Sequence, residues 1–201
     1  GTSDHVNVYG PKGTQNLLDG FLKSLEIDIN VRIEDEKQRD LASIIKVSEI
    51  SEGLVMEDER VKVTALKVVH GLLENCFAFK FETKDKKVVF SGDTIYFPPL
   101  IEFSKDADLL VHEVMLERGI NVLAERLKKV KPNLIDHLMI SHTTAEDAAK
   151  LAKEANVKHM VFNHYVPHIP KEFPNSEFVD AAKRVWDGKI TAGYDLCEID
   201  F

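Results

Sequence analysis

The stretch that decides the fold is Val88-Val-Phe-Ser-Gly-Asp-Thr94. It begins with mostly apolar residues, and an apolar run of this kind is typical of a strand buried on both faces. The run breaks at Gly92, where a glycine lets the backbone approach another group closely. Asp93 then follows at the carboxyl end of the strand. Because a carboxylate at the mouth of a buried strand is costly unless a cation meets it, the stretch predicts a cation site.

Two other apolar runs end in a side chain that can bind a metal. Residues 61–69 lead into His70, and residues 160–163 lead into His164. We therefore expect three strand ends to form one rim around one metal site. Imidazole and carboxylate together suit Zn²⁺, Mn²⁺ or Fe, and one aspartate among histidines suits a bridge between two ions.

His142 has a different setting, because it directly precedes a predicted helix. Thr143 and Glu146 form the pattern of a capping box, which indicates that the helix begins there. The free N–H groups and the positive dipole end of a helix attract anions, so His142 is a candidate to act on an anionic leaving group. Glu113 is either an acceptor that orients His142 or His164, or a surface acid at a strand end. The histidines that we interpret as structural are His5, His137, His159 and His168.

Composition narrows the class of protein. A chain of 201 residues fits one domain, and 44% hydrophobic with 30% charged residues is ordinary for a soluble globular protein. No apolar run approaches the ~20 residues of a membrane span. The net charge of −8 argues against binding nucleic-acid backbones, which favour lysine and arginine stripes. We interpret Cys76 and Cys197 as buried free thiols rather than a disulfide.

The order of the predicted elements favours an α/β fold. Strand-like runs fill much of the first half of the chain, and strands alternate with helices in the second half, which is typical of a layered α/β domain. The second-half elements that we expect are helices at 116–130, 143–155 and 176–186, an extended segment at 138–142 and a final strand at 190–199.

Six motifs occur in one order along nearly the whole chain: Tyr9-Gly-Pro-Lys-Gly, Val68-Val-His70-Gly, Phe90-Ser-Gly-Asp93-Thr, Val111-His-Glu113, His142-Thr-Thr-Ala-Glu-Asp-Ala-Ala and Phe162-Asn-His164. In this order they resemble the metallo-β-lactamase superfamily, specifically its ribonuclease Z and arylsulfatase-like branch. The resemblance implies an αββα sandwich with a dinuclear metal centre on its edge. We expect residues 1–201 to form a single, N-terminally incomplete domain of this kind, the later two-thirds of the fold.

The resemblance also implies roles for individual residues. His70 matches a ligand of the first metal, Asp93 the bridging ligand and His164 a ligand of the second metal. His142 matches the histidine that contacts the scissile group, with Glu113 behind it. The implied cofactors are two divalent metal ions, with Zn²⁺ first and Mn²⁺ or Fe as alternatives.

One motif of the family is absent from the chain. The His-x-His-x-Asp-His motif of the superfamily supplies four ligands and the acid that orients the attacking water. Ser3-Asp4-His5 ends like this motif, but Thr2 stands where its second histidine would be. Each metal would then keep one terminal ligand and the shared Asp93, fewer than the three protein ligands usual for zinc. We expect full activity to need an upstream segment, from the same gene or from another chain.

The resemblance and the charge together suggest the substrate. Ribonuclease Z carries a long tRNA-gripping arm between the strands that match 77–81 and 88–90, where this chain has only a short charged loop. We therefore expect a hydrolase of a small anionic ester, such as a phosphodiester or an aryl sulfate, that uses a metal-bound hydroxide. Nucleic acid is not expected as a partner. The alternatives are a ribonuclease Z-type tRNA 3′-processing endonuclease and a non-catalytic fragment or partner subunit of the same fold.

Assembly and location follow from the same interpretation. An incomplete sandwich would leave an apolar sheet edge open, so we expect a homodimer or a complementing chain. We expect no membrane association. A cytoplasmic location is favoured, or a periplasmic one if a signal peptide was removed.

Overall fold

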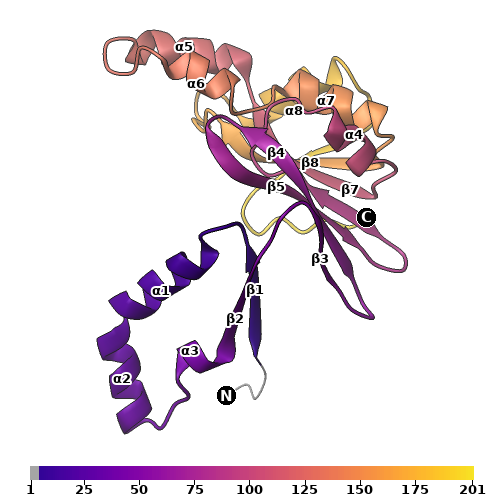
Figure 1. Cartoon of the computed structure of the whole chain (residues 1–201). Coiled ribbons are helices and arrows are strands. Elements are labelled where there is room, and N and C mark those ends of the chain that lie inside the picture. The colour runs from indigo at the N-terminus through magenta and orange to yellow at the C-terminus, as the bar shows by residue number, and fades with distance from the viewer. Residues whose placement is uncertain (1–4) are drawn as a thin grey trace. The chain divides into compact units, whose positions relative to one another are not determined.

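A computed structural model describes residues 5–201 of the chain (Figure 1). Its contacts divide the chain into two compact units, one that ends at Ser51 and one that extends over Glu52–Phe201. The expectation of a single domain over the whole chain stays a prediction. The partial motif predicted at Ser3-Asp4-His5 lies, apart from His5, outside the described residues.

The first unit is a parallel strand pair joined by helices. Its elements are β1 (Val6–Gly10), α1 (Thr14–Ser24), α2 (Glu26–Asp35), α3 (Leu41–Ile44) and β2 (Ile45–Glu49). β1 and β2 pair in parallel, and a parallel pair needs a crossover connection of this length. The carboxylate of Glu49 accepts hydrogen bonds from the N–H groups of Gly13 (2.8 Å) and Gln15 (3.3 Å). It thereby satisfies free N–H groups at the start of α1.

The second unit is built on a mixed sheet of seven strands in sequence order. The strands are β3 (Gly53–Glu57), β4 (Lys62–His70), β5 (Leu73–Glu82), β6 (Lys87–Phe90), β7 (Leu109–Met115), β8 (His159–Val166) and β9 (Lys189–Ala192). From β3 to β6 neighbouring strands are antiparallel and joined by short hairpins. From β6 to β9 they are parallel and joined by helical crossovers. The predicted α/β class is confirmed.

One face of this sheet is covered by the helices α4 (Pro99–Phe103), α7 (Ala145–Glu154) and α8 (Asn175–Lys183). α5 (Glu117–Leu127) and α6 (Leu134–Met139) pack instead on Met115 at the end of β7, through Ile120 and Leu138. Figure 1 shows α4, α7 and α8 together above the parallel strands. α7 turns a row of alanines and Leu151 toward buried strand residues such as Leu110, Met160 and Phe162. These small side chains let the helix lie close to the sheet, which places its first residue next to the carboxyl ends of the strands.

Two expected elements differ in the structure. The extended segment expected at 138–142 is instead the end of α6 and a turn, in which the N–H of His142 donates to the carbonyl of Leu138 (2.9 Å). Leu138 packs with Met115 and Ile120, so an apolar run that resembles a strand is the buried side of a helix. The last strand, expected at 190–199, is β9 and ends at Ala192, with the N–H of Gly193 still donating to the carbonyl of Phe162 on β8 (2.9 Å).

Two smaller expectations can also be compared with the structure. Cys76 and Cys197 are free thiols, as expected, although both are only half-buried. No helix within residues 5–201 has the length and apolar content that a membrane span requires.

Candidate metal centre

His70 stands at the end of β4, where the pairing with β5 shifts register. The next residue, Gly71, has a φ of 54°, and its N–H donates to the carbonyl of Ile140 (2.9 Å). His70 Nδ1 lies 2.7 Å from the carbonyl oxygen of Ser141. A carbonyl only accepts hydrogen bonds, so Nδ1 carries the proton and the lone pair is on Nε2. A histidine oriented in this way by a backbone carbonyl is the usual form of a metal ligand.

Asp93 follows β6 through a turn that requires glycine. Gly92 has a φ of 61°, and a Cβ on it would lie 2.7 Å from the carbonyl oxygen of Phe77 on the neighbouring strand. Only glycine combines this backbone conformation with this approach at low cost. The turn brings Asp93 beside His164, with 3.5 Å between Asp93 Oδ2 and His164 Nε2.

His164 occupies a bulge rather than the end of its strand. Glu113 pairs with Asn163 and Val114 pairs with Tyr165, so His164 is the extra residue between two pairs. Its φ is 41°, a value rare for a residue other than glycine. A bulge changes the direction in which a side chain points and is frequent beside functional sites. Here it lets β8 continue to Val166 while the imidazole lies at the site.

Glu113 and His142 form a pair removed from solvent. The side chain of Glu113 is 1% exposed and that of His142 is 8% exposed, with 3.3 Å between Glu113 Oε1 and His142 Nδ1. The same oxygen accepts hydrogen bonds from the backbone N–H groups of Thr143 (2.9 Å) and Thr94 (3.2 Å). These donors stabilise a buried carboxylate. Glu113 is therefore buried beside His142 and is not a surface acid; that it orients this histidine stays a prediction.

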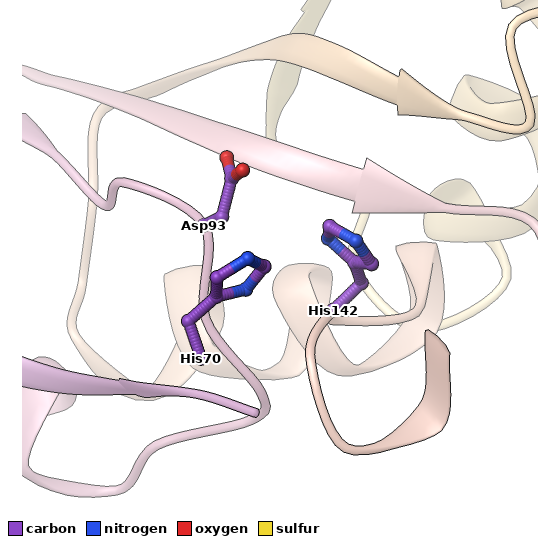
Figure 2. A group of neighbouring side chains, drawn as sticks. All are labelled: His70, Asp93 and His142. Carbon is purple, nitrogen blue, oxygen red and sulfur yellow. The ribbon is translucent and has the colours of Figure 1, made fainter. Parts of the chain in front are cut away.

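These side chains converge on one place from separate segments. Figure 2 shows the side chains of His70, Asp93 and His142 grouped together, and their candidate ligand atoms all lie within 4.8 Å of each other. Glu113, His142 and His164 form a second group under the same distance limit. The ring centroid of His142 is 5.2 Å from that of His70 and 5.4 Å from that of His164. His142 therefore lies between the two groups.

The chemistry of this donor set fits a divalent metal. Imidazole nitrogens and carboxylate oxygens are the ligands of catalytic zinc and related ions. Glu113 Oε2 is buried and has no hydrogen-bond partner among the described residues. A buried carboxylate oxygen without a hydrogen-bond partner is costly unless a cation or a water molecule binds it.

His112, immediately before Glu113, has a different environment. It is fully buried and makes one hydrogen bond, between its Nδ1 and the carbonyl of Glu113 (2.7 Å). Burial away from water lowers the pKa of His112 below the ordinary value for histidine. The imidazole is therefore neutral and packs behind the site.

Sequence reasoning missed three supporting residues. Thr94 and Thr143 hold Glu113 through their N–H groups, and Ser141 holds His70 through its carbonyl. Thr143 was expected to cap α7, but Thr144 does so by accepting from the N–H of Asp147 (3.2 Å). Two adjacent threonines give one capping signal, and sequence alone does not tell which of them is buried.

Comparison with known proteins finds a family whose sequences this chain matches. The family model described as "Beta-lactamase superfamily domain" matches residues 1–165. A ribonuclease Z from Mycobacterium marinum is 29% identical over 196 residues, which cover 97% of this chain and 67% of that protein.

Two solved structures share the fold. The metallo-β-lactamase fold protein YhfI from Bacillus subtilis has a TM-score of 0.62 at 18% identity, covering 96% of this chain and 64% of its own. The short form of human tRNase Z has a TM-score of 0.60 at 18% identity, covering 99% of this chain and 69% of its own. The expected metallo-β-lactamase fold is confirmed, and this fold implies divalent metal binding.

These relatives correct one expectation. Nucleic acid was not expected as a partner, on the grounds of net charge and the missing arm. That expectation is wrong, because the matched proteins are named ribonuclease Z and tRNase Z. The overall charge of −8 is a sum over the chain and says little about charge near the site.

Proposed function

Because the chain belongs to the β-lactamase superfamily and has the metallo-β-lactamase fold, we propose that it hydrolyses phosphodiester bonds in RNA. The observation that carries the proposal is the convergence of His70, Asp93, His142 and His164 beside the buried Glu113. The names of the relatives favour RNA over aryl sulfates and other small esters as the substrate.

The metal ligands in this proposal come from the end of β4, the turn after β6 and the bulge in β8. His70 would hold one ion and His164 a second, with Asp93 between them and in reach of both. We propose zinc as the metal, since the donors are imidazoles and a carboxylate. When bound, such ions polarise a phosphoryl oxygen and make a nucleophilic water available near neutral pH.

His142 is proposed to act on the leaving group. Glu113 Oε1 accepts the Nδ1 proton of His142 and fixes the ring, so Nε2 faces the reacting group. When Nε2 is protonated, the Glu113 carboxylate stabilises the imidazolium. The Nε2–H then donates to the oxygen that departs from phosphorus.

The proposal is tested with three substrates and two matched variants. The substrates are bis(p-nitrophenyl) phosphate, p-nitrophenyl sulfate and an RNA hairpin with a single-stranded 3′ extension, each with added Zn²⁺ or Mn²⁺. His164→Ala removes a proposed ligand, and His168→Ala removes an exposed histidine four residues further along the same segment. Because full activity is expected to need an upstream segment, the test compares rates between variants of the same chain. We expect the wild type and His168→Ala to cleave the RNA and the phosphodiester at the same rate, and His164→Ala to be slower by at least about a hundredfold.

Two outcomes would contradict the proposal. Equal RNA cleavage by the wild type and His164→Ala would mean that this histidine does not hold a catalytic ion. Hydrolysis of the sulfate ester without cleavage of either phosphodiester would assign the site to other chemistry.

A further inference from the structure

A helical hairpin connects the two halves of the candidate site. It consists of α5, the loop at residues 128–133 and α6. We call it the 117–139 hairpin. Glu113 lies just before it and His142 just after it. The N–H of Met115 donates to the carbonyl of Thr143 (2.8 Å), which ties its two ends together. Figure 1 shows α5 and α6 extending side by side from the body of the second unit.

The tip of this hairpin is basic. Residues 125–131 carry four cations (Arg126, Lys128, Lys129 and Lys131) and one carboxylate (Glu125), which gives a net charge of +3. All five side chains are exposed. Arg126 pairs with Glu172 (2.8 Å), and Lys128 pairs with Glu125 (3.4 Å). Exposed pairs of this kind are weak, and a stronger anion displaces them easily.

Two of the lysines are open to a partner. Lys129 and Lys131 make no ion pair with any residue in the described part of the chain. At physiological ionic strength the Debye length is about 8 Å, so the negative charge elsewhere on the chain is largely screened at this tip. Glu172 beside Arg126 reduces the local charge from +3 to +2. An anion that approaches here meets this positive local charge, not the overall charge of −8.

An exposed apolar row links this basic tip to the site. Ile135 and Met139 lie one helical turn apart on α6, and Ile140 follows them; each is at least 40% exposed. Met139 and Ile140 also line a cleft of about 390 Å³ that contains His142. Exposed apolar side chains beside a basic segment suit RNA, which presents base and sugar surfaces between its phosphates.

We infer that the 117–139 hairpin binds the phosphate backbone of an RNA substrate through Lys129 and Lys131. The inference rests on the proposed function and names the element that grips the substrate. α5 has 11 residues and is therefore about 16 Å long. The tip accordingly reaches phosphates several nucleotides away from the bond that is cleaved.

The test is RNA binding measured by fluorescence anisotropy between 50 and 200 mM salt. The RNA is the labelled hairpin with a 3′ extension, checked on a gel after each titration to be intact. Lys129→Gln/Lys131→Gln removes the two free cations. The matched control, Lys84→Gln/Lys86→Gln, removes two exposed lysines at the same spacing in the loop between β5 and β6.

The hairpin variant should bind RNA about tenfold more weakly at low salt, and its log–log salt slope should be shallower by about 0.7 to 0.9 per lost contact. The control should bind like the wild type. Equal binding by all three proteins, a loss confined to the control, or no RNA binding by the wild type would each overturn the inference. Hydrolysis of bis(p-nitrophenyl) phosphate by the wild type separately reports on the proposed function.

Discussion

At the scale of single residues, the buried pair of Glu113 and His142 is the most informative feature. A carboxylate with almost no solvent exposure is held by two backbone N–H groups and aimed at an imidazole. That arrangement fixes which nitrogen of His142 carries a proton and which faces outward. His70 differs from His142 in this respect, because its ring is held by a backbone carbonyl rather than by a carboxylate.

The first prediction concerns His142. We expect His142→Ala to lower kcat on bis(p-nitrophenyl) phosphate by about 10²- to 10⁴-fold, the range usual for a lost proton donor. We expect the variant to keep its bound zinc, which is measured by mass spectrometry of the metal. The control is His70→Ala, which should lose metal and activity together. If both variants lose the same amount of zinc, His142 is a ligand and not a proton donor.

A second prediction at this scale concerns His159. Its side chain is buried, with Nε2 2.9 Å from the hydroxyl of Thr191, and burial followed by the charge of Lys189 lowers its pKa. Below about pH 6.5 the unfolded chain binds more protons at this residue than the folded chain does. The free energy of unfolding should therefore fall as the pH drops from 7.5 to 5.5.

Urea unfolding at the two pH values checks this prediction. His112 is also buried with a lowered pKa and contributes in the same direction. We therefore expect His159→Gln to reduce the loss of stability on acidification, not to abolish it. A variant with the same pH dependence as the wild type would show that folding does not lower the pKa of His159.

The residue types of the site could be predicted from the sequence, because each follows an apolar run. His70 is the last residue of β4 and Asp93 follows β6 by a short turn, so their convergence follows from strand order. The bulge at His164 could not be predicted, since one extra residue in a pairing leaves no mark on the apolar pattern. Their roles as ligands stay predictions.

At the scale of elements, the turn after β6 does the most to position the site. It sends Asp93 toward the other strand ends only because Gly92 adopts a left-handed conformation against the backbone of β5. The strands around it could be read from apolar runs. α6 could not, because Leu138-Met-Ile is compatible with a strand or with the buried side of a helix.

The third prediction belongs to this turn. Gly92→Ala should lower the free energy of unfolding by about 1 to 3 kcal/mol, because alanine is strained at this φ and its Cβ meets the carbonyl of Phe77. The matched control is Gly20→Ala in α1, where a Cβ meets nothing within 4 Å. That change should stabilise by about 0.5 to 1 kcal/mol. Urea unfolding measures both, and a neutral Gly92→Ala would contradict the account of the turn.

At the scale of the whole molecule, charge is distributed unevenly. The chain carries −8 overall, yet the tip of the 117–139 hairpin carries +3. The net charge of the whole chain led to the wrong expectation that nucleic acid is not a partner. Binding depends instead on the charge within about a Debye length of the binding surface. The sequence alone gave no reason to give the 125–131 segment special weight. The structure draws attention to this segment, because the residues that flank the hairpin are hydrogen-bonded to each other beside the site.

The central claim is that side chains from the end of β4, the turn after β6 and the bulge in β8 hold divalent ions in common. Zinc binding to the whole chain tests this claim most directly. Equilibrium dialysis compares the wild type with Asp93→Asn, which keeps the size of the side chain and removes its charge. The account predicts that Asp93→Asn weakens zinc binding by at least about tenfold while the fold is retained by circular dichroism. Equal zinc binding by the two proteins would contradict the account.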